Sequence, residues 1–222
     1  MKTPALKSSS GYALTFSAKC EAFLQVVFLP PAATETNASN SIDFEVDGNW
    51  TPLNKAELDA AIFNSSSKKA PGLDRMSFTI IKKVYCTIPD TFYVLYSKLI
   101  AVGYHPTVWK ESIGVIIKKA KKEDYSDPKA YRIISLLNCL GKVFEKIVAE
   151  SLSYLAETTS LLFLNQMGSR KQRSAIDAAL SLLSNIELNQ HKKKFTSCLF
   201  KDNKGAYDHV DKAQLLDIWS KN

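Results

Sequence analysis

The chain has 222 residues, of which 45% are hydrophobic and 23% charged, and its formal net charge is +7. This composition is typical of a soluble globular protein that is long enough to bury a real core. No apolar run approaches the roughly 18–20 residues that span a bilayer, and Lys19, Cys20 and Glu21 interrupt the N-terminal apolar residues. We therefore expect neither a membrane span nor a secretory signal.

Residues 1–50 predict a poorly ordered leader or linker, because Pro30 and Pro31 precede the small polar run AATETNASNS. The pattern becomes clearer after Trp50. Asn54 followed by Glu57 is typical of a helix start, and Leu58, Ala61 and Ile62 then lie on one helical face.

Two further short helices are predicted after a turn at Pro71-Gly72. The first has Phe78, Ile81 and Val84 on one face. The second is predicted to be capped by Asp90 and to end at Gly103. Its expected buried stripe consists of Phe92, Leu95, Tyr96, Leu99 and Ile100.

Residues 112–117 form a short apolar run that predicts a strand, and 133–137 are expected to pair with it across a charged loop. Helices are expected at 141–157, at 174–189 and from 211 to 219. Residues 195–200 indicate a buried strand that ends at Asp202. In the helix at 174–189, the residues expected to be buried are Ile176, Ala179, Leu180, Leu183 and Ile186. Irregular alternation of helices and strands indicates the α+β class.

The segment from Cys198 to Asp208 carries the most chemistry. A carboxylate at a strand tip, here Asp202, can hold Mg²⁺, which prefers oxygen ligands. Gly205 and Ala206 leave backbone N–H groups open to phosphate oxygens, and Tyr207 can form the floor under a sugar. Spacing alone favours a strand, a turn and a helix with exposed aspartates, because one aspartate is not a metal site.

Five segments resemble, in the same order, motifs of reverse transcriptases from non-LTR (LINE-type) retrotransposons. Residues 200–210, FKDNKGAYDHV, resemble the first catalytic-aspartate motif FLDVKGAFDNV. Residues 68–74 resemble the KAPGPDG box, and 103–110 resemble the GYFPxxWK segment. Residues 130–152 resemble SYRPISLLxxLGKxxEKxxxxRL, and 165–180 resemble NQFGFRxxRSxxDAL. The resemblance covers residues 51–219.

The resemblance implies a right-hand polymerase fold, of which residues 51–222 would supply the fingers and the N-terminal part of the palm. It also implies DNA synthesis from dNTPs on an RNA template and a DNA primer, with two Mg²⁺ ions at the reacting phosphate. By its match, Asp202 would be a catalytic metal ligand, and the backbone carbonyl of Asn203 would face the second ion. The other residues matched to functional positions are Arg132, Lys118, Gly205, Ala206 and Tyr207 toward the dNTP, and Arg170 as template or active-site support.

The chain also departs from these motifs. Its 222 residues contain no Tyr/Phe-x-Asp-Asp box, which supplies the other metal aspartates. Lys201 and Asn203 flank the aspartate where the family has Leu and Val, Ile133 replaces the Pro of YRPI, and Ser169 replaces the Phe of GFR. We therefore expect a truncated reverse transcriptase domain with an incomplete Mg²⁺ site and no polymerase activity of its own.

Two alternatives stay open. Residues 68–150 carry fifteen Lys and Arg against eight Asp and Glu, as a non-catalytic RNA- or DNA-binding module would require. Charge alone, however, favours a solvated lysine-rich surface, and without the resemblance Arg132 would be an ion-pair partner of Asp124 or Asp127. The other alternative is a pseudogene product without function.

Four cysteines without a CxxC pair fit reduced thiols in an intracellular protein.

Overall fold

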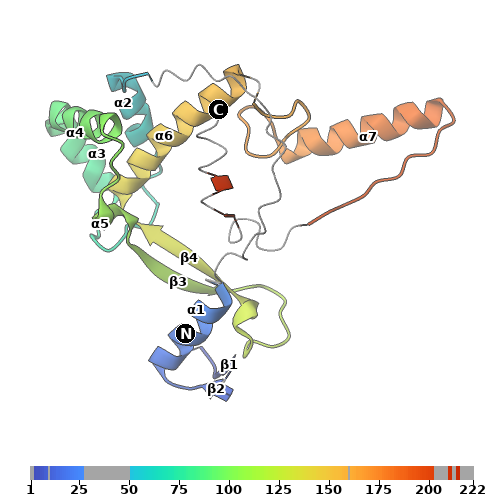
Figure 1. Ribbon diagram of the computed structural model, residues 1–222, viewed down its shortest axis with the longest axis horizontal. Coiled ribbons are helices and arrows are strands. Elements are labelled where there is room, and N and C mark those ends of the chain that lie inside the picture. The colour runs from blue at the N-terminus through green and yellow to red at the C-terminus, as the bar shows by residue number, and fades with distance from the viewer. Residues whose placement is uncertain are drawn as a thin grey trace.

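The computed structural model describes residues 3–9, 11–27, 51–159, 161–202, 210–211 and 214–215. Within these ranges the chain forms helices and two small antiparallel sheets, which confirms the predicted α+β class. Figure 1 shows a group of helices from which a long β-hairpin extends to a small N-terminal unit. Among the described residues, no helix has the length and apolar character that crossing a membrane requires.

The N-terminal unit, residues 3–27, consists of β1 (Leu6–Ser8), β2 (Gly11–Ala13) and α1 (Phe16–Val27). Its buried side chains share one core with two residues far along the chain, of which Ala130 ends the 3-10 helix η1 (Pro128–Ala130) and Tyr131 begins β4 (Tyr131–Leu137). The members are Leu6, Ala13, Ala22, Phe23, Ala130 and Tyr131. The sequence indicated only a poorly ordered leader here, because such short elements acquire a core only through contact with residues far along the chain. The domain division at residue 50 stays a prediction.

The main hydrophobic core is built from α2 (Lys55–Phe63), α3 (Phe78–Thr87), α4 (Pro89–Ala101) and α6 (Cys139–Thr158), and the short helix α5 (Thr107–Lys110) adds Trp109 to it. The start of α2 is the predicted capping box. The Asn54 side chain accepts from the Glu57 N–H at 2.9 Å, and the Glu57 carboxylate accepts from the Asn54 N–H at 3.0 Å. All three residues predicted to be buried on α2 are buried.

The buried faces of α3 and α4 differ in part from the prediction. Val84 and Leu95 were expected in the core but are 36% and 42% exposed. The ring of Tyr85 fills the core of α3, and Tyr96 is buried as predicted. Both hydroxyls find acceptors, on the Asp59 carboxylate and on the Leu140 carbonyl.

The C-terminal end of α4 was predicted correctly, but its N-terminal cap was not. Pro89 is its first residue and Ile88 its cap, so the cap predicted at Asp90 is wrong by two positions; proline suits this place because the first helical N–H lacks a partner in any case. At the other end, Gly103 has a positive φ of 61°, as a helix-ending glycine requires.

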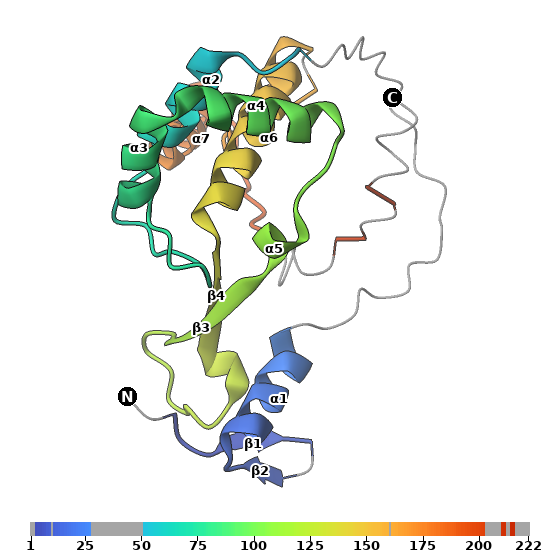
Figure 2. The same cartoon turned by 90° about the vertical axis from the view of Figure 1, so that its left-hand side faces the viewer.

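The long hairpin is built from β3 (Ser112–Lys118) and β4 (Tyr131–Leu137), which pair antiparallel from Ser112 opposite Leu137 to Lys118 opposite Tyr131. This confirms the predicted strand pair. The short helix α5 (Thr107–Lys110) leads into β3, and the 3-10 helix η1 (Pro128–Ala130) leads into β4. Figure 2 shows the hairpin running from the helices to the N-terminal unit, so that it joins the two cores.

The C-terminal part of the described chain packs least. Helix α7 (Ala175–His191) begins where the helix at 174–189 was predicted to start, with Ser174 as its cap, but none of its residues is buried, so the predicted burial is wrong. The buried strand predicted at 195–200 is also absent from the described residues, and Phe195 and Phe200 are exposed. A strand needs a hydrogen-bonding neighbour and a helix face needs a surface to cover it; none of the described residues supplies either. Most of the helix predicted at 211–219 lies outside the described residues.

Candidate functional site

The β3–β4 hairpin carries two of the residues matched to dNTP contacts, and its register separates them. Arg132 lies opposite Ile117, whereas Lys118 lies opposite Tyr131. Because side chains alternate between the faces of a strand, Arg132 and Lys118 project from opposite faces of the hairpin. The structure thus places them one register step apart without bringing their charged groups onto one surface.

Lys118 is held against the loop that joins the two strands. Its Nζ lies 4.7 Å from the centroid of the Tyr125 ring, within cation–π range. The Tyr125 hydroxyl donates to the Lys119 carbonyl, and the Tyr131 hydroxyl donates to the Tyr125 carbonyl, both at 2.9 Å. These bonds order the loop, so the Lys118 ammonium has a defined position on the face nearest the N-terminal unit.

Arg132 projects from the open face of the hairpin. Its neighbours on this face include Ile117 and Ile134, each 42% exposed. The alternative in which Arg132 pairs with Asp124 or Asp127 is not what the structure shows. Asp124 pairs with Lys7 at 2.6 Å, and Asp127 accepts the Lys129 N–H at 2.8 Å. Within the described residues, Arg132 makes no ion pair, and its guanidinium is exposed beside an apolar surface.

Arg170 lies in the turn between α6 and α7, where its guanidinium donates to Glu157 from two nitrogens and to the Phe163 carbonyl. These bonds hold the pKa of Glu157 below its usual value. Arg173 donates to the carbonyls of Leu164 and Gln166 in the same turn. Both arginines therefore organise this turn, and the role of Arg170 as template or active-site support stays a prediction.

Asp202 is exposed and lies at the end of the extended segment 195–202. Four other matched residues, Asn203, Gly205, Ala206 and Tyr207, lie outside the described residues. The described part of the chain contains no group of three or more His, Cys, Asp or Glu side chains that could hold a metal ion. The described side chains therefore do not fit a pair of Mg²⁺ ions, which one carboxylate is too few to hold.

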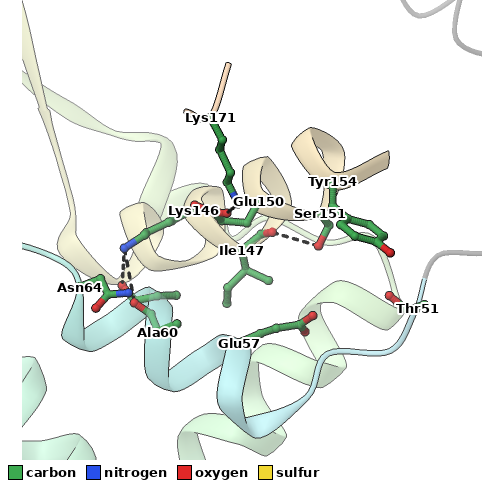
Figure 3. A pocket seen from close by; sticks show the side chains of 11 residues that line it. Thr51, Glu57, Ala60, Asn64, Lys146, Ile147, Glu150, Ser151, Tyr154 and Lys171 are labelled. Carbon is green, nitrogen blue, oxygen red and sulfur yellow. Dashed lines mark hydrogen bonds and ion pairs between the residues drawn. The ribbon is translucent and has the colours of Figure 1, made fainter. Parts of the chain in front are cut away.

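A pocket of about 520 Å³ lies between α2 and α6 and was not indicated by the sequence. Figure 3 shows Lys146 reaching across it to the C-terminal end of α2, with its Nζ 3.4 Å from the carbonyl oxygens of Ala60 and Ala61. Burial lowers the pKa of Lys146. The positive charge complements the carbonyl end of the helix, so the geometry explains Lys146 as a helix cap rather than as a ligand-binding group.

Comparison with known proteins agrees with the motifs. Residues 117–221 match the sequence model of the family described as reverse transcriptase (RNA-dependent DNA polymerase). The chain is 31% identical over 202 residues to the putative 115 kDa protein in type-1 retrotransposable element R1DM of Drosophila melanogaster. That similarity covers 91% of this chain, so it extends into the N-terminal 50 residues, and it covers 19% of the relative.

Two further relatives from Drosophila melanogaster show the same pattern. The chain is 28% identical over 159 residues to the probable RNA-directed DNA polymerase from transposon BS, covering 72% of this chain and 17% of the relative. It is 27% identical over 143 residues to the RNA-directed DNA polymerase from mobile element jockey, covering 64% and 16%. The chain thus spans less than a fifth of the length of each of these three relatives.

Proposed function

Because this chain carries reverse transcriptase sequence of the non-LTR retrotransposon type, we propose a place for it in a right-hand polymerase. Residues 51–222 form the fingers and the first part of the palm. In this role the chain binds the phosphates of a dNTP and of an RNA template with its DNA primer. The proposed nucleotide-binding part is the β3–β4 hairpin.

The exposed guanidinium of Arg132 is the observation that supports the proposal most directly. Its guanidinium is exposed, makes no ion pair within the described residues, and stands beside the exposed side chains of Ile117 and Ile134. A planar, always charged fork suits phosphate oxygens, and the apolar side chains beside it suit the face of a base. Lys118 lies on the other face, so we propose that it contacts a different phosphate from the one that Arg132 binds.

The palm part of the proposal concerns Asp202 and the residues after it. Asp202 and the Asn203 carbonyl are the proposed metal ligands, Gly205 and Ala206 the proposed amide donors to the triphosphate, and Tyr207 the residue that rejects a ribose 2′-hydroxyl. The 222 residues contain no second metal-binding aspartate box. We therefore propose that this polypeptide by itself binds nucleotide and nucleic acid without synthesising DNA.

Nucleotide binding tests the role of Arg132. The anisotropy of a fluorescent dNTP is measured with the wild-type chain and with Arg132→Gln, Arg132→Lys and Lys98→Gln. Loss of the bidentate guanidinium is expected to weaken binding roughly tenfold in Arg132→Gln and less in Arg132→Lys, which keeps the charge. Lys98, exposed on α4, is the matched control and should leave binding unchanged. Equal affinities for Arg132→Gln and Lys98→Gln would contradict the proposal.

Primer extension tests the absence of synthesis. The purified chain is incubated with an RNA template, a DNA primer, dNTPs and Mg²⁺ or Mn²⁺, and no extended primer is expected. Template-dependent incorporation that disappears in Asp202→Ala would show that the chain is a polymerase in its own right.

A second candidate function is a nucleic-acid-binding module that has no nucleotide site. The loop between β3 and β4 favours it, because Lys121, Lys122 and Lys129 line one exposed pocket there. Such a module binds RNA with an affinity that falls steeply with salt, in proportion to the phosphates contacted. Salt-sensitive RNA binding with no dNTP binding would support this candidate over the first.

A further inference from the structure

The N-terminal unit is attached to the loop that joins β3 and β4 (residues 119–130). The Lys7 N–H donates to the Ser126 carbonyl at 2.8 Å, and Leu6 is fully buried in the core that contains Ala130 and Tyr131. The rings of Phe23 and Tyr131 meet edge to face, with centroids 5.4 Å apart. Figure 2 shows α1, β1 and β2 beside this end of the hairpin. Residues 6–23 thus pack against the end of a loop more than a hundred residues later.

One ion pair joins the two segments. Lys7 Nζ lies 2.6 Å from Asp124 Oδ2, and Asp124 Oδ1 accepts from both the N–H and the hydroxyl of Ser126 at 2.7 Å. Both carboxylate oxygens are therefore occupied, and the lysine is the main cause of a lowered Asp124 pKa. Asp127 is also occupied, because it caps η1 by accepting the Lys129 N–H.

Among the described residues, three lysines of the same loop are left without a carboxylate partner. Lys121, Lys122 and Lys129 line a pocket of about 430 Å³ together with Asp124, Asp127 and Glu123. In the described part of the chain, none of these three lysines forms an ion pair with a carboxylate. Asp124 lines the same pocket as these three lysines, and within the described residues its carboxylate forms its ion pair with Lys7.

We propose that Lys7 is a positioning residue, which binds Asp124 and so keeps the lysines of this loop available to the phosphate groups of a nucleic-acid strand. The inference rests on the proposed nucleic-acid binding and adds a residue that no sequence motif indicated. Lys7 acts through Asp124 and need not touch the bound strand. The N-terminal unit is on this view part of the nucleic-acid-binding end of the hairpin rather than a leader.

The test measures the binding of a short labelled single-stranded RNA to the full chain at low and moderate salt. Lys7→Gln is compared with Lys83→Gln, an exposed lysine on α3 whose loss changes the net charge equally. Lys7→Gln is expected to lower the affinity by about 5- to 10-fold, because one charge is lost and Asp124 sequesters a second lysine. Lys83→Gln should change it less than about twofold.

The double variant Lys7→Gln/Asp124→Asn decides between positioning and direct contact. If Lys7 acts through Asp124, removing the competing carboxylate restores RNA affinity to that of the wild type. A double variant that binds as weakly as Lys7→Gln, or a single Lys7→Gln that binds like Lys83→Gln, would overturn the inference while leaving nucleic-acid binding intact. No RNA binding by the wild type at low salt would overturn both.

A variant that keeps Lys7 serves as the control for loss of RNA affinity through detachment of the N-terminal unit. Asp124→Asn alone should bind RNA at least as tightly as the wild type, since it removes the only anion that the proposal says must be neutralised. Weaker binding by Asp124→Asn would contradict the inference, and thermal melts of all four variants show whether each one is folded.

Discussion

The guanidinium of Arg170 holds the carboxylate of Glu157 across the turn that joins α6 to α7, and its Nε donates at 2.8 Å. A second nitrogen bonds the other carboxylate oxygen, and a further N–H bonds the Phe163 carbonyl. Only 9% of the Arg170 side chain is exposed. The pair ties the end of one helix to the approach to the next, in a part of the chain that has little apolar packing.

Arg170→Lys should loosen this turn, because an ammonium group cannot reproduce the two parallel bonds of the guanidinium. We expect the melting temperature to fall by a few degrees and the amides of residues 161–170 to exchange faster with solvent. Lys171→Ala is the control: Lys171 pairs with Glu150, but both side chains are more than half exposed, and exposed pairs add little stability. Equal effects of the two substitutions would argue against the prediction.

The same pair predicts a dependence of stability on pH. The folded pKa of Glu157 is lowered by Arg170, so its stabilising contribution is complete above the unfolded value of about 4.3. The contribution disappears as pH falls through the lowered folded pKa. Melting curves of the wild type and Glu157→Gln should therefore differ most near neutral pH and converge in acid. A difference that stays constant down to about pH 2 would contradict this assignment.

Gly72→Ala should destabilise the chain strongly. A Cβ built at Gly72 would lie 2.2 Å from Asn138 Oδ1 and 2.6 Å from the Asn138 backbone nitrogen, in a buried contact that cannot give way. We expect a loss of at least about 2–3 kcal/mol, as for overpacked cores. Gly168→Ala is the matched control, because nothing lies within 4 Å of its Cβ. Urea unfolding of both variants provides the comparison.

Ile147 and Ile176 offer a matched test of which helix face is buried. Ile147 on α6 is 4% exposed, whereas Ile176 on α7 is 71% exposed. Ile147→Ala should cost about 2–4 kcal/mol, and Ile176→Ala less than about 0.5 kcal/mol. Equal costs in urea unfolding would mean that α7 is covered in solution and would contradict the exposed helix described above.

Asp202→Asn should leave folding unchanged, because Asp202 is exposed. Calorimetric titration of the wild type without dNTP should show no saturable Mg²⁺ site below millimolar concentration, since Mg²⁺ needs more than one carboxylate to give up its water shell. A saturable micromolar site that is lost in Asp202→Asn would show that further residues complete a metal centre.

Local structure followed from the sequence wherever the deciding contacts lie within a few residues. The Asn54–Glu57 box starts α2, because the cap is closed by a side chain three residues away, and α7 starts at Ser174, where a helix was predicted to begin. The short apolar run at 112–117 likewise predicted a strand that pairs with 133–137. The motifs that match reverse transcriptases are also read from short segments, and so they needed no tertiary information.

Contacts between distant segments were decided by the tertiary structure alone. The turn at Pro71-Gly72 was predicted, but the need for a residue without a side chain comes from Asn138, which packs against it. An amphipathic pattern predicted that α7 exists and could not tell whether anything covers it. Lys7 and Asp124 are 117 residues apart, and neither carries a pattern that points to the other. Such pairs depend on how the whole chain folds, because burial and ion pairing are properties of the space around a residue.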